Sequence, residues 1–254
     1  MTGSAAEGLW RARLEHTSVP RDFDGYPTSE DEGYAIQAAI TAASGLDVIG
    51  WKIGATTAPL LAVIGVDQPF AGPLFAEFTR DNGAEFPIHP RQGLETEFTL
   101  RLKADLAHRT EPYGRDEVEA AIAAIIPSFE IIGFRFEGEP AGAGFRLIAD
   151  GGANVGTVLG PEITEWDADA LSGHQTSLTL NGEHVATGQP ADLLWDHLFD
   201  AVGWLADQPV TAGRGLLAGD IIMTGTCTGM TPLAPGDEAI ADFGTMGEVR
   251  AVFA

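Results

Sequence analysis

Three glutamates in this chain could together bind one small metal ion. Glu95 and Glu97 lie in a strand-like run, residues 94–102, and because side chains alternate along a strand, both point to the same face. Glu130 lies in the apolar run 125–132, where a carboxylate is costly to desolvate unless a cation or strong donor meets it. Three converging carboxylates suit a hard divalent ion such as Mg²⁺. A solvated strand face would also explain Glu95 and Glu97, but the neighbours of Glu130 offer it no polar face.

A lysine and several polar residues could complete a site around these carboxylates. Lys52 is one of only two lysines and lies in an apolar, glycine-bounded segment. It could bind a substrate carboxylate or donate a proton, or it could extend to solvent from a strand end. Glu77 and Asp150 are each bounded by turn residues or glycines, so both could equally be solvated or capping loop residues. The glycine-flanked segment 225–229 lacks a phosphate-loop pattern, but its backbone could cradle a small anion.

Two other reactive residues lack the surroundings that catalysis requires. His197 falls on an amphipathic stretch, where a surface or structural histidine is the expected interpretation. Cys227 has no basic neighbour in sequence to lower its pKa, so we do not assign it as a nucleophile.

Composition excludes several classes of partner. The chain has 37 acidic and 14 basic residues and a net charge of −23, which would repel nucleic acid and anionic membrane surfaces. No apolar run approaches the roughly 18–20 residues needed to cross a bilayer. The N-terminal residues lack the basic and apolar parts of a secretory signal, and the single Cys227 cannot form an internal disulfide. We therefore expect a cytoplasmic globular protein without nucleic-acid or membrane partners.

The elements that must position these residues indicate an α+β chain with a largely β core. Ser29 followed by Glu32 is a capping-box pattern that opens a helix ending near Gly45. A short strand is expected over 48–54, and Asn181-Gly182 is a strong hairpin signal.

Other segments carry weaker patterns. Helical spacing predicts a helix over 116–125 that Pro127 stops, and an amphipathic helix over 193–205. Residues 1–27 form a loosely patterned lead-in, and the glycine-rich residues 137–147 are expected to form a loop. We predict an N-terminal helical region over 1–47 and a catalytic domain over 48–254.

Short segments spread over nearly the whole chain match one known family in order and spacing. They are 50–56, 65–69, 72–77, the Glu95-Thr96-Glu97 pair, 127–130, 149–150, 181–182 with Gly188, 219–222 and 235–237. On these segments the chain resembles the 2-keto-4-pentenoate hydratase/4-oxalocrotonate decarboxylase group of the fumarylacetoacetate hydrolase superfamily.

The resemblance implies a fumarylacetoacetate-hydrolase-like fold, with a mostly β core of mixed sheets and a small helical N-terminal region. It also implies a Mg²⁺ or Mn²⁺ ion held by Glu95, Glu97 and Glu130, with Lys52 as the active-site lysine.

The family pattern further implies the remaining site residues. Lys52, Glu77 and Asp150 are the expected catalytic residues, although Glu77 stands where the family usually has Asp, and Gly151 replaces a common Asn. The expected substrate-binding residues are Leu74, Asn154 and Thr226. The Gly-His-Pro segment that is usual in the family is missing. This part of the chain has Gly188-Gln189-Pro190 instead, and Trp195-Asp196-His197 follows nearby.

The implied activity is metal-assisted hydration of a 2-hydroxy-2,4-dienoate to a 4-hydroxy-2-oxo acid in aromatic catabolism. The alternatives are decarboxylation of a 4-oxalocrotonate-type 2-oxo acid and C–C bond hydrolysis of an acylpyruvate. The partner would be a small 2-oxo or 2-hydroxydienoic acid, and we expect a homo-oligomer.

An alternative from another functional class is an acidic, non-catalytic metal-binding or structural protein. It requires Glu130 to face solvent, with no pocket joining it to Lys52.

Overall fold

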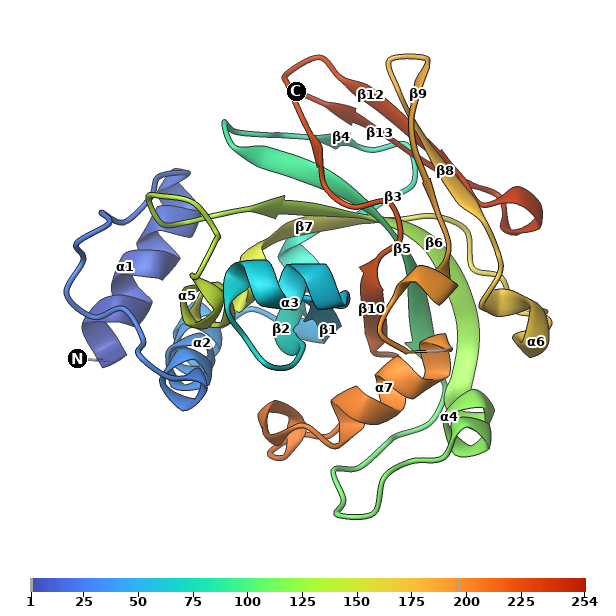
Figure 1. The fold of residues 1–254 in the computed structure, drawn as a ribbon, viewed down its shortest axis with the longest axis horizontal. Coiled ribbons are helices and arrows are strands. Elements are labelled where there is room, and N and C mark those ends of the chain that lie inside the picture. The colour runs from blue at the N-terminus through green and yellow to red at the C-terminus, as the bar shows by residue number, and fades with distance from the viewer. Residues whose placement is uncertain (1, 196) are drawn as a thin grey trace.

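Two helices begin the chain and pack against each other at one end of the molecule (Figure 1). The computed structural model of the protein describes residues 2–195 and 197–254. Helix α2, Glu30–Ser44, starts at Ser29, whose side chain accepts a hydrogen bond from Glu32 N, and ends at Gly45 with a φ of 64°. The Glu32 carboxylate reaches back to Thr28 N at 2.7 Å, one residue before the N-cap. The predicted helix and its caps are confirmed.

The prediction of a loosely patterned lead-in over 1–27 is wrong, because helix α1 spans Thr2–Glu15. Its buried face carries Ala5, Leu9 and Ala12, which have helical spacing but contribute two small side chains. Small residues give a weak periodic signal in sequence. Met1 lies outside the described residues, and the boundary between 1–47 and 48–254 stays a prediction.

A curled, mixed sheet forms the centre of the molecule (Figure 1). Its two longest strands, β5 (Gln92–Leu102) and β6 (Ile122–Gly133), are antiparallel neighbours. The strands run in the order β2 (Phe70–Phe75), β1 (Val48–Gly54), β10 (Ile221–Thr226), β5, β6, β7 (Asn154–Leu159) and β3 (Thr79–Asp81), with β11 (Thr231–Pro232) also paired to β5. Strands β1 and β10 are parallel, as are β3 and β7, and the other pairs are antiparallel.

A second, five-stranded sheet covers the first, and the largest apolar cluster includes residues of both. Its order is β4 (Glu85–Phe86), β13 (Glu248–Phe253), β12 (Glu238–Asp242), β8 (Thr176–Leu180) and β9 (Glu183–Gly188). Asn181 and Gly182 connect β8 to β9, which confirms the predicted hairpin. The fully buried Phe98 and Phe243 stack edge to face between the sheets, with ring centroids 4.9 Å apart. The predicted α+β class with a largely β core is confirmed.

The predicted helix over 116–125 is wrong in its second half. Helix α4 spans Arg115–Ala121, and β6 begins at Ile122 and continues through Pro127. Residues 122–133 are buried almost throughout, and a short apolar run buried on both faces shows neither periodicity clearly. Pro127 is tolerated because the pairing of β6 with β7 begins only at Ser128.

The predicted helix over 193–205 starts later than expected. Helix α7 spans Leu198–Ala206 and is capped by His197, whose Nδ1 accepts from Phe199 N. Asp196, near the start of the predicted helix, lies outside the described residues.

The glycine-rich segment predicted as a loop contains the start of helix α5, Gly144–Ala149. The remaining helices are α3 (Ala58–Ile64) and α6 (Ala168–Leu171), with short 3₁₀ turns η1 (Ala76–Phe78), η2 (Gly151–Ala153), η3 (Pro190–Asp192), η4 (Pro209–Thr211) and η5 (Gly244–Met246). In the described part of the chain, no helix has the length and apolar character needed to cross a membrane.

Candidate metal centre and its pocket

The three glutamates converge at the middle of the curled sheet. Glu95 and Glu130 are directly opposite each other on β5 and β6, and Glu97 follows two residues along β5 on the same face. One carboxylate oxygen from each lies within 4.8 Å of those of the other two. All three side chains are buried, with 9%, 1% and 0% of their surface exposed in the order Glu95, Glu97, Glu130. The solvated-strand interpretation is therefore wrong, as is the solvent-facing Glu130 that a non-catalytic protein requires.

Burying these carboxylates together makes their ionised forms unfavourable. Burial, followed by repulsion from Glu130, raises the pKa of Glu95 to about 7, although Lys52 opposes the shift. Burial and the charges of Glu130 and Glu95 raise the pKa of Glu97 well above its ordinary value. The backbone N–H of Gly225 partly opposes this by donating to Glu97 Oε2 at 2.9 Å. Three carboxylates beside one ammonium leave two negative charges uncompensated, which a divalent cation would neutralise.

Lys52 reaches this cluster from β1. Its Nζ lies 3.1 Å from Glu130 Oε2 and donates to the carbonyl oxygen of Gly152 at 3.0 Å. Burial alone would lower the pKa of Lys52, but the charges of Glu130, Glu95 and Glu97 outweigh burial and raise it. The amine therefore stays protonated at neutral pH.

Gly152 lets the backbone approach the Lys52 side chain closely. Its φ is 71°, and a Cβ at this position would lie 2.8 Å from Lys52 Cδ. A larger residue would therefore displace the lysine from the carboxylates.

A pocket of about 180 Å³ opens beside this carboxylate cluster, the candidate metal centre. Its polar end carries Lys52, Glu95, Glu97 and Thr226, and Thr226 Oγ1 is buried with no hydrogen-bond partner among the described residues. Apolar side chains form most of the remaining wall: Ile53, Ala55, Leu60, Ile64, Phe70, Ile132, Phe134, Pro140, Leu147, Ala153 and Met230. Among the described residues that line this pocket, Lys52 is the only cation.

The structure brings some of the expected substrate-binding residues to this site and not others. Thr226 lines the pocket. Asn154 is buried behind it and donates from Nδ2 to Glu130 Oε1 at 2.9 Å, so it orients a carboxylate. Leu74 does not line the pocket, since it packs in a small apolar cluster with Ile221 and Met223.

Neither expected proton-transfer acid lines the pocket. Glu77 lies exposed on the 3₁₀ turn η1. Asp150 is buried and paired with Arg135, and its Oδ2 accepts from Arg135 N at 3.0 Å. Burial raises the pKa of Asp150, and the Arg135 charge opposes the rise. Arg135 also donates to Asn154 O at 2.9 Å, so Asp150 supports the residue that holds Glu130.

Other residues confirm structural interpretations or were missed in the sequence. His197 Nε2 lies 2.8 Å from Ala168 O, which fits a satisfied structural histidine. Burial raises the pKa of the Cys227 thiol, which agrees with its exclusion as a nucleophile.

Thr56 and Met230 line the pocket but were not predicted. Thr56 ends a segment that carried the family resemblance, so it could have been found.

Comparisons with known proteins agree with this geometry. A family model described as "Fumarylacetoacetate (FAA) hydrolase C-terminal" matches residues 87–254. The chain is 33% identical over 232 residues to 2-keto-4-pentenoate hydratase 1 of Dechloromonas aromatica, covering 89% of this chain and 86% of that protein. It is 28% identical to 4-oxalocrotonate decarboxylase of Pseudomonas putida, covering 98% and 95%.

The fold also matches a solved structure closely. The 4-oxalocrotonate decarboxylase from Pseudomonas putida G7, complexed with magnesium and adipate, superimposes with a TM-score of 0.88 at 26% identity. The match covers 100% of this chain and 97% of that one.

Proposed function

This chain belongs to the fumarylacetoacetate hydrolase family and is a hydratase or a decarboxylase, and of these two we propose that it is a metal-dependent hydratase. It would add water to a 2-hydroxy-2,4-dienoate with an uncharged tail and give a 4-hydroxy-2-oxo acid. One observation carries the proposal: a buried carboxylate cluster with a lysine lies at the polar end of a pocket whose other walls are apolar.

The donor set fits a hard divalent cation, Mg²⁺ or Mn²⁺. Glu95, Glu97 and Glu130 would hold it, and their uncompensated charge matches the charge of the ion. When bound, the cation would supply Lewis-acid stabilisation of charge on the substrate 2-oxygen, worth several kcal/mol. Asn154 would keep Glu130 oriented, since its amide donates to the second oxygen of that carboxylate.

Lys52 and Thr226 would bind the polar end of the substrate. An ammonium has three N–H donors, and Lys52 directs two toward Gly152 O and Glu130, which leaves one for a substrate oxygen. The unpartnered hydroxyl of Thr226 offers a second hydrogen bond in the same pocket. Since the pKa of Lys52 is raised, it acts as a cation and hydrogen-bond donor and not as a base.

The reaction would proceed by moving a proton before water adds. Ketonisation of the dienol transfers a proton to the far carbon and leaves a 2-oxo-3-enoate. Water then adds its hydroxyl group to carbon 4 and a proton to carbon 3. Lys52 holds the polar end of the substrate during both changes and stabilises negative charge that grows there.

The two acids outside the pocket, Asp150 and Glu77, have different roles in this proposal. Asp150 would act as a positioning residue through Arg135 and Asn154. For Glu77 the proposed proton transfer rests on the family resemblance, and Glu77→Gln tests it. A roughly tenfold loss of kcat with unchanged melting temperature would support that role, and unchanged kcat would exclude it.

The apolar walls favour the hydratase over the two alternatives. A 4-oxalocrotonate-type substrate carries a second carboxylate, and no described residue at the apolar end of the pocket offers a cation for it. Hydrolysis of an acylpyruvate calls for a histidine–glutamate pair that activates water, and no described histidine lines this pocket. The decarboxylase remains the second candidate because of the close fold match to one.

Feeding both substrates to the Mg²⁺-loaded enzyme tests this choice. We expect loss of dienoate absorbance without CO₂ release, and main release of CO₂ from the dicarboxylate would contradict the hydratase. Glu97→Gln should abolish turnover, while the exposed Glu183→Gln serves as a matched control that keeps it. Full activity of Glu97→Gln would exclude that residue as a ligand.

We also propose that the protein forms a homo-oligomer in the cytoplasm. The family resemblance implies an assembly of identical subunits, and a buried, free cysteine agrees with a reducing compartment. Light scattering and cell fractionation test these two statements.

A further inference from the structure

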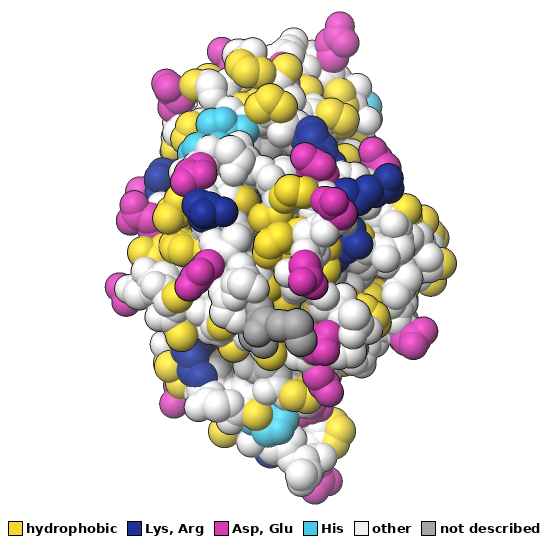
Figure 2. Space-filling model, turned by 90° about the vertical axis from the view of Figure 1, so that its left-hand side faces the viewer, with side chains coloured by type: hydrophobic (Ala, Val, Ile, Leu, Met, Phe, Trp, Pro, Cys, Tyr) yellow, Lys and Arg dark blue, Asp and Glu magenta, His cyan; other side chains and the backbone are white. Residues whose placement is uncertain are grey.

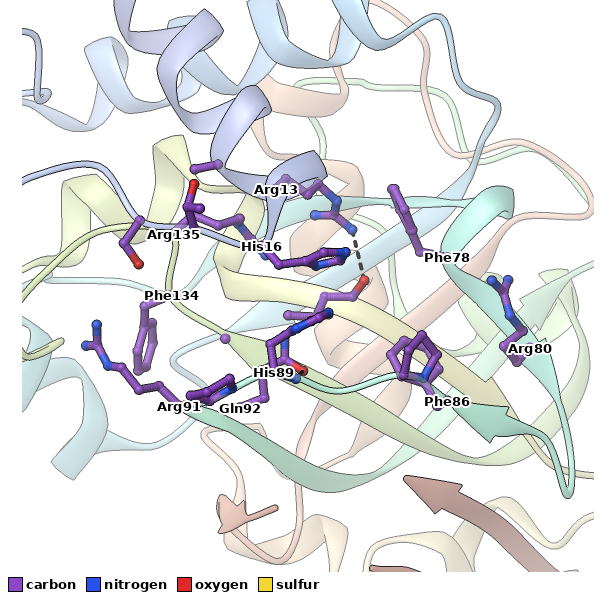
Figure 3. A pocket seen from close by; sticks show the side chains of 17 residues that line it. Arg13, His16, Phe78, Arg80, Phe86, His89, Arg91, Gln92, Phe134 and Arg135 are labelled. Atoms are coloured by element: carbon purple, nitrogen blue, oxygen red, sulfur yellow. Dashed lines mark hydrogen bonds between the residues drawn. The ribbon is translucent and has the colours of Figure 1, made fainter. Parts of the chain in front are cut away.

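A second cavity, of about 210 Å³, lies between the end of α1 and the segment that leads into β5 (Figure 3). It shares only Phe134 with the pocket at the metal centre. Figure 3 shows Arg13 of α1 and His16, which directly follows that helix, near His89, with Arg80 to one side and Arg91 to the other.

The charge of this cavity is opposite to that of the molecule. The chain carries 37 acidic residues against 14 lysines and arginines, and Figure 2 shows acidic side chains scattered over one face. No aspartate or glutamate is among the described residues that line this cavity. Its ionisable lining residues are Arg13, Arg80, Arg91, Arg135, His16 and His89.

Most of this positive charge lacks a carboxylate partner. Within the described parts of the chain, Arg135 is paired with Asp150, but Arg13, Arg80 and Arg91 form no ion pair. These three arginines donate to backbone carbonyls instead. Arg13 donates to Asn154 O at 2.8 Å and Val155 O at 3.0 Å, and Arg80 donates to Glu77 O at 2.7 Å and Thr79 O at 3.0 Å. Arg91 donates to Phe136 O at 3.4 Å and also to Gly138 O.

Two buried donor or acceptor atoms in the lining are also unsatisfied. Among the described residues, Arg13 Nε and His89 Nε2 have no hydrogen-bond partner. Burial and the charge of Arg135 lower the pKa of Arg13 well below its usual value. Buried polar atoms without partners are rare in native proteins. An anion in this cavity would accept from Arg13 Nε–H and from His89 when its Nε2 carries the proton.

Aromatic side chains form part of the remaining lining, beside small and polar residues such as Ala12, Ser18 and Gln92. The Arg13 guanidinium lies 4.1 Å from the Phe78 ring centroid, and the rings of His16 and His89 stack 3.7 Å apart. Phe86 and Phe134 complete these surfaces. The volume exceeds the roughly 150 Å³ that accommodates benzene in an engineered cavity. Flat walls suit a planar body, and a planar guanidinium matches a carboxylate.

We propose that this cavity binds a small planar carboxylate, separately from the metal centre. The carboxylate lies against Arg13 and His89, and the planar body lies against the aromatic side chains of the lining. Neither residue touches the pocket of the metal centre, so the site does not depend on the proposed hydratase activity.

Calorimetric titration of the Mg²⁺-loaded protein with three probes tests this site. Benzoate carries both charge and ring, benzamide carries the ring alone, and inorganic phosphate carries charge alone. We expect benzoate to bind more tightly than either of the others. Arg13→Gln and His89→Ala should each weaken benzoate binding about tenfold or more, equivalent to about 1.4 kcal/mol.

Two control variants locate the binding. Arg11→Gln removes an exposed arginine of the same helix that does not line the cavity, and Lys52→Met removes the cation of the metal-centre pocket. Both should change benzoate affinity by less than about twofold. Absence of benzoate binding, equal binding of benzamide, or tighter binding of phosphate would overturn the proposal. So would a loss of benzoate binding caused by Lys52→Met and not by Arg13→Gln.

Discussion

Without metal, the buried carboxylates should make the stability of this protein fall as pH rises. The pKa of Glu95 is about 7 in the folded protein, against an ordinary value of 4.5. Between these values the folded state holds a proton that the unfolded state has released, so raising the pH favours unfolding. At about 1.4 kcal/mol per pKa unit, this contribution is about 3 kcal/mol, developed fully above pH 7.

Glu95→Gln should remove this part of the pH dependence. In EDTA, we expect the free energy of unfolding of the wild type, relative to the variant, to fall by about 3 kcal/mol from pH 4.5 to pH 8. At about 2–4 °C per kcal/mol for a chain of this size, the melting temperature should shift by about 6–12 °C. Mg²⁺ should restore the wild type more at pH 8 than at pH 5.5, because ligands must lose protons to bind metal.

Denaturant unfolding at several pH values, with EDTA or Mg²⁺, provides the measurement. Glu183→Gln, an exposed change of the same type, should follow the wild type under all conditions. If Glu95→Gln lost stability with pH as steeply as the wild type, or gained as much from Mg²⁺, the reasoning would be refuted.

Three further substitutions probe the pocket. Lys52→Met should lower kcat/KM about 100-fold or more. It should also reduce the melting temperature in EDTA, because Glu130 loses its cation. Near-normal kcat/KM would exclude Lys52 from catalysis. Asn154→Ala should weaken Mg²⁺ binding about 10–100-fold in calorimetry, since Glu130 Oε1 loses its donor, and unchanged affinity would remove Asn154 from the proposed site. Met230→Lys places a cation in the apolar wall of the pocket. The ratio of kcat/KM for a dicarboxylate substrate to kcat/KM for the dienoate with an uncharged tail should rise about tenfold. An unchanged ratio would contradict the role given to that wall.

The clustering of the three glutamates was largely predictable because strand geometry constrains it strongly. Alternation along a strand places Glu95 and Glu97 on one face, and the apolar neighbours of Glu130 demanded a compensating partner. The register that sets Glu130 opposite Glu95 depends on pairing between distant segments, so the pattern of either strand alone could not give it. Lys52 was found because a lone lysine in an apolar strand is unusual.

The acids outside the strands could not be placed in this way. Asp150 forms an ion pair with Arg135, and the sequence around neither residue reveals this contact. Glu77 lies on a short 3₁₀ turn, where no periodicity fixes the direction of its side chain. The boundary between α4 and β6 was misplaced for a related reason: residues 122–125 are apolar on every side and suit either element until their neighbours are known.

A crystal of the protein grown with Mn²⁺ and measured for anomalous scattering tests the central claim most directly. The account predicts one strong peak about 2.1–2.2 Å from a carboxylate oxygen of each of Glu95, Glu97 and Glu130, with Lys52 facing the same pocket. No peak at this cluster, or a peak that any one of the three carboxylates fails to contact, would contradict it.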